Sequence, residues 1–270
     1  MTTDWTSLAL HPQLVQAVTE LGYAEPTAIQ SAVIPLLLAG QDVIAQAQTG
    51  TGKTAAFALP IIQNLQGGRK QVQSLILAPT RELAIQVASA FHSYGHHSAI
   101  SVLAVYGGQP YERQIRRLQR GVDVVVGTPG RLLDLMRQNA LDLSAVRAVV
   151  LDEADEMLSM GFIEDIETIL GETPETRQTA LFSATLPAEI RRLAERYLRQ
   201  PQTVRIGSSH VTVDALTQRY YLVREADKLA ALSRLFEVEE IHSALVFART
   251  RAATGELASD LTARGFPAEA

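Results

Sequence analysis

The chain has 270 residues and a net charge of −5, and its 47% hydrophobic and 20% charged residues are typical of globular proteins. It contains no cysteine, which excludes disulfides, a thiol nucleophile and a cysteine-based zinc site. No apolar run approaches the ~20 residues that span a bilayer, and Met1-Thr2-Thr3-Asp4 begins no signal peptide, so we expect a cytoplasmic protein with no membrane partner.

Apolar, β-prone runs alternate with helix-forming runs over residues 1–206. The predicted strands are residues 42–46, 74–78, 100–106, 122–126, 147–151, 178–182 and 202–206. The predicted helices are residues 11–21, 27–39, 53–65, 80–94, 109–119, 129–138, 161–170 and 187–198. This alternation predicts an α/β fold, in which a mainly parallel sheet with right-handed crossovers is sandwiched by helices.

A glycine-rich loop separates the first predicted strand from the helix predicted at 53–65. Its sequence is Ala47-Gln48-Thr49-Gly50-Thr51-Gly52-Lys53-Thr54. The two glycines allow backbone N–H groups to face inward, and the helix N-terminus adds partial positive charge. The pattern is typical of a phosphate-binding loop, in which Lys53 reaches the β- and γ-phosphates and the Thr54 hydroxyl ligates Mg²⁺. Ala47 departs from the general pattern, which has glycine there, and a chance glycine-rich turn is the alternative.

An acidic tetrapeptide, Asp152-Glu153-Ala154-Asp155, follows the strand predicted at 147–151. Carboxylates at the carboxyl end of a strand lie where open α/β sheets bind ligands. Asp152 would hold Mg²⁺, partly through water, and Glu153 would orient and deprotonate the attacking water. The alternative is an acidic first turn of a helix. The loop and the tetrapeptide together predict nucleotide hydrolysis with Glu153, Lys53 and Asp152 as catalytic residues.

These two motifs and six others resemble the DEAD-box RNA helicase family, whose name-giving motif is the tetrapeptide at 152–155. The other six are a Q motif at 22–30, motif Ia at 79–84, the GG element at 107–108, motif Ib at 128–131, motif III at 183–185 and, less sharply, motif IV at 245–250. The family usually has alanine at the position of Ala47, which accounts for that departure. The resemblance covers nearly the whole chain and implies a RecA-like fold.

The resemblance assigns nucleotide binding to the Q motif and the phosphate loop. The residues implied are Trp5, Tyr23, Thr27, Gln30, Gln48, Thr49, Gly50, Thr51, Gly52, Lys53 and Thr54. Gln30 would read the adenine edge, because its amide offers one donor and one acceptor group. Trp5 stands where the family usually has an upstream phenylalanine that packs by the adenine, and an ordinary core residue is the alternative.

The resemblance assigns contacts with the RNA backbone to motifs Ia, GG and Ib. The residues implied are Pro79, Thr80, Arg81, Gly107, Gly108, Thr128 and Arg131. Small residues suit close approach to phosphates and arginines add bidentate donors, while a surface ion pair is the alternative for each arginine. A coupling link between the nucleotide site and an interdomain face is implied for Asp155, Ser183 and Thr185. Helix capping before Leu186-Pro187 is the alternative for the last two.

Two further groups of side chains need an interpretation. Four arginines recur at helical spacing before the strand at 122–126, namely Arg113, Arg116, Arg117 and Arg120. They could extend a track for RNA, but a solvated helix face is the favoured interpretation. Three histidines cluster near the end of the helix at 80–94, namely His92, His96 and His97. Gly95 interrupts them and no glutamate completes a metallohydrolase pattern, so a structural role is favoured over metal binding.

A boundary is expected at 207–216, a polar stretch that we interpret as a linker between a domain at 1–206 and a tail at 217–270. In the tail, the predicted strands are residues 218–223 and 243–249, and the predicted helices are residues 225–237 and 251–264. This tail is shorter than the roughly 100 residues of a usual α/β domain, and family members have a complete second RecA-like domain here. We therefore expect a fragment whose exposed strand edge could pair with another chain.

The resemblance implies an ATP-dependent RNA helicase, which uses ATP and Mg²⁺ to unwind short RNA duplexes or to remodel RNA–protein complexes. Its partner would be single-stranded or short duplex RNA, bound through contacts with the RNA backbone. In the family, the missing C-terminal helicase domain supplies arginines that complete the ATP site, and loss of such an arginine costs about 10³–10⁵ in rate. We therefore expect this chain to bind Mg-nucleotide, to touch RNA weakly and to hydrolyse ATP slowly. The alternatives are an RNA clamp without unwinding and an ATPase acting on DNA.

Overall fold

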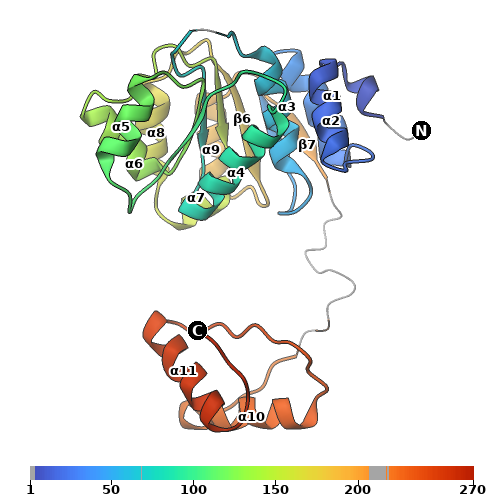
Figure 1. Ribbon diagram of the computed structural model, residues 1–270, viewed down its shortest axis with the longest axis vertical. Coiled ribbons are helices and arrows are strands. Elements are labelled where there is room, and N and C mark those ends of the chain that lie inside the picture. The colour runs from blue at the N-terminus through green and yellow to red at the C-terminus, as the bar shows by residue number, and fades with distance from the viewer. Residues whose placement is uncertain (1–3, 68, 207–216, 218) are drawn as a thin grey trace. The chain divides into compact units, whose positions relative to one another are not determined.

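The computed structural model describes residues 4–67, 69–206, 217 and 219–270 (Figure 1). The chain divides into two compact units, residues 1–209 and 210–270. The linker predicted at 207–216 lies outside the described residues.

The first unit is built around a seven-stranded sheet in which every pair of neighbouring strands is parallel. The strands are β1 (Val43–Gln46), β2 (Ser74–Leu77), β3 (Val102–Val105), β4 (Val124–Gly127), β5 (Ala148–Leu151), β6 (Gln178–Ser183) and β7 (Gln202–Arg205). Their order across the sheet is β3-β4-β2-β5-β6-β1-β7. All seven predicted strands and the parallel α/β architecture are confirmed, because continuous apolar runs are what a doubly covered sheet requires.

Helices connect the strands and cover the sheet. They are α1 (Pro12–Glu20), α2 (Ala28–Leu38), α3 (Lys53–Asn64), α4 (Arg81–Tyr94), α5 (Tyr111–Gln119), α6 (Pro129–Arg137), α7 (Ala154–Ser159), α8 (Ile163–Gly171) and α9 (Ala188–Tyr197). The eight predicted helices of this unit are confirmed. Sequence patterns missed the 3₁₀ turn η1 (Trp5–Leu8) and α7, because each is too short to show helical periodicity. None of the described helices is long and apolar enough to cross a membrane.

Two hydrophobic clusters lie on opposite faces of the sheet, since successive strand residues point to opposite sides. Val150 of β5 belongs to a cluster with residues of α1, α2, α3 and α4. Its neighbours Val149 and Leu151 belong to a second cluster with residues of α5, α6, α7, α8 and α9. The sheet is thus sandwiched as predicted, and the loops at its carboxyl edge are held by a rigid core on both sides.

The second unit contains η2 (Glu225–Asp227), α10 (Lys228–Val238) and α11 (Arg251–Ala263). The two predicted helices are therefore confirmed, and Phe236 packs against Phe266 with ring centroids 5.4 Å apart. The two strand predictions are wrong for the described residues, because neither 219–223 nor 243–249 is paired with another strand. Leu222 and Phe247 are 93% and 88% exposed. β-prone sequence alone does not form a strand when no neighbouring strand satisfies its backbone.

Candidate functional site

The predicted phosphate loop lies between the end of β1 and the start of α3. Gly50 and Gly52 have φ angles of 84° and 91°, in the left-handed region that favours glycine. The Lys53 side chain is only 6% exposed, and its Nζ donates to the Ala47 carbonyl at 3.2 Å. The lysine thus folds back over the loop and holds its cation inside the turn where phosphate oxygens would bind.

The Q motif is attached directly to this loop. The Gln30 Nε2 atom donates to the Gly52 carbonyl at 3.1 Å, and Gln30 Oε1 accepts from the Thr27 backbone N–H at 2.8 Å. The Thr27 hydroxyl donates to the Thr51 carbonyl at 2.9 Å. A Cβ atom at Gly52 would lie 2.4 Å from Gln30 Nε2, so a larger residue there would displace the Gln30 amide in addition to adopting the strained positive φ. Gln30 therefore positions the loop, a contact that sequence patterns did not indicate, while adenine reading by its amide stays a prediction.

Trp5 and Tyr23, two aromatic residues predicted to bind nucleotide, have different environments. Trp5 is only 2% exposed, and its indole N–H donates to the Tyr23 carbonyl at 2.9 Å. This burial is what the alternative, a core residue, requires. Tyr23 is 40% exposed, and its ring lies 6.3 Å from that of Tyr94. Tyr23 is thus the more exposed of the two residues, and the contact of Trp5 with adenine stays a prediction.

The first two residues of the acidic tetrapeptide lie beside the phosphate loop. Asp152 is 2% exposed, and burial raises the pKa of its carboxyl group to about 6, although the nearby Lys53 cation opposes this rise. Glu153 has a φ of 51°, unusual for a residue other than glycine, and its carboxylate accepts from the Thr49 hydroxyl at 3.2 Å. Strain of this kind often marks a functional position. The Asp152 N–H also donates to the Leu77 carbonyl, the last residue of β2, at 3.0 Å.

Asp155 joins the acidic tetrapeptide to motif III. Its carboxylate accepts from both the backbone N–H and the hydroxyl of Thr185, each at 2.8 Å, and its own N–H donates to the Ser183 hydroxyl at 3.2 Å. Burial opposes ionisation, but hydrogen bonds from the Thr185 and Ser183 hydroxyls outweigh it and lower the pKa of Asp155. Pro187 is the N-cap of α9, so neither hydroxyl has the capping role considered as the alternative. Asp155 also lies in the first turn of α7, as the acidic-turn alternative expected.

The strand order divides the carboxyl edge of the sheet into two halves. Strands β5, β6 and β1 are neighbours, and their loops carry the tetrapeptide, motif III and the phosphate loop. We call this the acidic half. Strands β3, β4 and β2 are also neighbours, and their loops carry the GG element and motifs Ib and Ia. We call this the basic half, since it contains Arg81 and Arg131. Motifs that are far apart in the sequence therefore lie in two groups, with the acidic tetrapeptide, motif III and the phosphate loop in one half and motifs Ia, GG and Ib in the other.

In the basic half, most of the predicted residues line the ends of the strands. Thr80 caps α4 by accepting from the Leu83 N–H at 3.2 Å, and the Thr128 N–H donates to the Val105 carbonyl at 3.0 Å. Pro79 is buried, whereas Gly107 and Gly108 are exposed and leave backbone groups accessible. Arg81 is exposed, with its guanidinium carbon 5.0 Å from the centre of the Tyr106 ring.

Arg131 is the predicted residue whose environment differs most from expectation. It is 9% exposed, and its guanidinium carbon lies 4.0 Å from the Tyr111 ring centre while Nη1 donates to the Gln109 carbonyl at 3.0 Å. Among the described residues it forms no ion pair. The Tyr111 hydroxyl in turn donates to Asp134 at 2.8 Å. Arg131 therefore positions the loop after the GG element. Tyr111 was not predicted from the sequence, although an aromatic residue so close to the GG element was the available signal.

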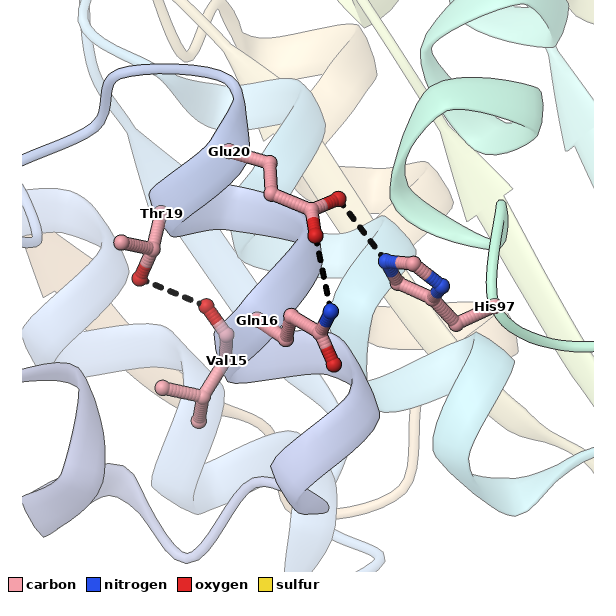
Figure 2. A network of polar contacts seen from close by, with 5 residues as sticks. All are labelled: Val15, Gln16, Thr19, Glu20 and His97. Carbon is pink, nitrogen blue, oxygen red and sulfur yellow. Dashed lines mark hydrogen bonds and ion pairs between the residues drawn. The ribbon is translucent and has the colours of Figure 1, made fainter.

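Within the histidine cluster, His97 has the structural role that the sequence favoured. The His97 Nε2 atom lies 2.8 Å from Glu20 Oε2, and the Gln16 amide donates to the other oxygen of the same carboxylate at 2.8 Å (Figure 2). These contacts join α1 to the turn after α4. The described part of the chain contains no group of three or more His, Cys, Asp or Glu side chains arranged for a metal ion.

The parallel sheet and the glycine-rich loop between β1 and α3 place the first unit in the class of RecA-like α/β domains. A family model described as DEAD/DEAH box helicase matches residues 27–193. The chain belongs to this family.

Curated relatives and a solved structure agree with this assignment. The ATP-dependent RNA helicase DeaD of Escherichia coli K12 is 50% identical over 265 residues, which cover 98% of this chain and 42% of that protein. The DEAD-box ATP-dependent RNA helicase CshA of Bacillus cereus is 48% identical over 267 residues, covering 99% of this chain and 51% of that protein. The crystal structure of a DEAD box protein from Methanococcus jannaschii matches with a TM-score of 0.73 and 40% identity, over 98% of this chain and 72% of that one. The chain thus spans about half the length of these curated relatives.

Proposed function

We propose that this chain is the nucleotide-binding part of an ATP-dependent RNA helicase. The observation that carries the proposal is the division of one sheet edge into an acidic half with a phosphate loop and a basic half with exposed glycines. The relatives named ATP-dependent RNA helicases support it. We further propose that residues 1–206 form the ATP-binding domain, that 207–216 are a linker, and that 217–270 begin a second helicase domain.

In the acidic half, the chain's own residues would bind the triphosphate and activate water. Lys53 would neutralise the β- and γ-phosphates, and the Glu153 carboxylate would accept the proton of the attacking water. Mg²⁺ fits the residues present, because the Thr54 hydroxyl and the buried Asp152 carboxylate are both oxygen ligands. When bound, the metal would neutralise charge on the phosphates.

In the basic half, the exposed glycines and the half-buried threonines would approach the RNA backbone. Gly107 and Gly108 leave room and free backbone groups beside Arg81, whose guanidinium is exposed for a phosphate. Arg131 would act on RNA through the loop that it positions, because its guanidinium is buried against Tyr111. Recognition of this kind ignores base sequence and depends on salt.

Asp155, Ser183 and Thr185 would couple nucleotide state to domain movement. Their hydrogen bonds connect the tetrapeptide after β5 to the loop after β6, so a shift of one loop moves the other. The second unit adds one more proposal, that the exposed segments around Leu222 and Phe247 support self-association. Sedimentation at increasing concentration tests this, and a constant monomer mass would contradict it.

The first test is nucleotide binding by this chain. Titration with fluorescent ADP in Mg²⁺ should show binding that Lys53→Ala abolishes, while the fluorescence of buried Trp5 confirms that the variant is folded. Equal affinity of the variant would refute the phosphate-loop assignment.

The second test is steady-state ATP hydrolysis with single-stranded RNA, with DNA of the same sequence, and without nucleic acid. We expect nucleotide binding with slow turnover, and Glu153→Gln should keep binding and remove the turnover that remains. RNA-specific stimulation would support the helicase function directly. Stimulation by DNA equal to that by RNA would refute RNA as the substrate, and retained turnover in Glu153→Gln would remove Glu153 as the base.

A further inference from the structure

Helix α5 and its C-cap residue present four arginines on one face. The arginine stripe consists of Arg113, Arg116, Arg117 and Arg120, and all four are exposed. Spacings of three and four residues place these side chains within one side of a helix. The opposite side carries the buried Gln114 and the partly buried Ile115 and Leu118, which pack on the core. The stripe therefore faces solvent because the other side of α5 is fixed against the sheet.

The charges of the stripe are not neutralised by the described residues. None of the ion pairs among them includes a stripe arginine, and the one side-chain hydrogen bond of the stripe runs from Arg116 Nε to the Glu112 backbone carbonyl. Asp134 of α6 accepts a hydrogen bond from the Tyr111 hydroxyl. Like charges three and four residues apart destabilise a helix. The repulsion among the four arginines lowers the stability of the helix, and no ion pair within the described residues offsets it. We take this as an indication that the stripe binds an anion outside the chain.

The position of the stripe points to the kind of anion. Helix α5 begins directly after the loop of the GG element and packs against β3, the strand at the edge of the basic half (Figure 1). The stripe spans about 10 Å along the helix axis, so it continues the basic half along α5. The chain as a whole has a net charge of −5, so the four positive charges of the stripe form a local basic surface on an acidic protein.

We propose that the arginine stripe is a binding track for the phosphate backbone of RNA that extends beyond the motif-lined edge. The proposal rests on the proposed function, because it assumes that RNA lies on the basic half. RNA is favoured over an acidic protein because α5 follows the GG element and packs on the edge strand of the basic half, which the proposed function assigns to RNA. Guanidinium groups bind phosphates and carboxylates alike in bidentate fashion, so position is the argument that selects RNA. Contacts of this kind add affinity and salt dependence without base preference.

The test compares a stripe variant with a charge-matched control. The stripe variant carries Gln at all four positions, a residue that preserves helix propensity. The control variant carries Gln at four exposed arginines elsewhere, namely Arg137, Arg147, Arg192 and Arg224. Both variants lose the same net charge, so any general electrostatic effect is equal. Binding of a labelled single-stranded RNA of about 20 nucleotides, longer than common single-strand sites, is measured over a series of salt concentrations.

We expect the stripe variant to bind RNA at least roughly tenfold more weakly than the control at low salt. Each lost phosphate contact should reduce the slope of log affinity against log salt by about 0.7. Equal affinity and equal slope in the two variants would overturn the proposal while leaving RNA binding by the wild type intact. A wild type that binds no RNA would overturn the proposed function as well. Displacement of the RNA by polyglutamate as effectively as by unlabelled RNA would overturn RNA as the occupant and favour an acidic protein.

Discussion

The buried carboxyl group of Asp152 should make the metal-free protein less stable as pH rises. Its pKa increases from an ordinary 3.8 to about 6 because the folded state removes it from water. At about 1.4 kcal/mol per tenfold change, this difference corresponds to roughly 3 kcal/mol. Between pH 4 and 6 the unfolded state has already released the proton while the folded state keeps it. The contribution of Asp152 to the unfolding free energy should therefore fall across this range and level off above it.

Asp152→Asn removes the ionisation but keeps the shape of the side chain. An asparagine oxygen can still accept the Glu153 N–H that now donates to Asp152 Oδ1 at 3.1 Å. The variant should match the wild type in stability near pH 4 and exceed it by up to roughly 3 kcal/mol at pH 7, while losing affinity for Mg-nucleotide.

Urea unfolding from pH 4 to pH 7 measures this difference, with a chelator present and nucleotide absent. The fluorescence of Trp5 is a suitable probe, since it is the single tryptophan and is buried in the first unit. Other titrating groups cancel in the comparison between variants. A stability difference that stays constant with pH, or an asparagine variant that is less stable at pH 7, would refute the reasoning.

Three other substitutions test the geometry of the site. In calorimetric titration, Gly52→Ala should weaken ADP binding at least roughly tenfold more than Gly50→Ala. Both positions have a positive φ, but only Gly52→Ala places a Cβ against the Gln30 amide of the Q motif. Similar losses of affinity in the two variants would contradict that close approach. Arg131→Lys should lower the unfolding free energy by about 1–3 kcal/mol, since lysine replaces neither the stacking on the tyrosine ring nor the guanidinium hydrogen bond, and an unchanged urea midpoint would count against it. Thr185→Val should raise the pKa of Asp155 in a carboxyl-detected NMR titration, because one of the hydrogen bonds that lower it is lost; an unmoved titration would mean that this hydroxyl does not stabilise the carboxylate.

The secondary structure of the first unit could be predicted from the sequence because each strand and each turn is marked by the residues within it. Apolar runs marked all seven strands, and the glycines of the phosphate loop marked a turn between β1 and α3. Parallel strands then placed the motifs at one edge without any knowledge of strand order.

Properties that depend on neighbours were not predictable in this way. Whether Arg131 points to solvent or into the protein is decided by Tyr111, and whether Gln30 is free is decided by the Gly52 carbonyl. The same holds for the second unit, where the segments around Leu222 and Phe247 have β-prone sequence but pair with no strand among the described residues. Patterns describe what a segment prefers, while burial and pairing depend on what surrounds it.

The junction between the two halves of the sheet edge is narrow. The acidic half and the basic half meet where β5 lies beside β2, and a backbone hydrogen bond from the Asp152 N–H to the Leu77 carbonyl joins the ends of these two strands. Asp152 begins the tetrapeptide, and Leu77 lies two residues before Pro79 of motif Ia. The exchange rate of one amide proton therefore reports on the boundary between the two halves, and it changes if they separate at this point.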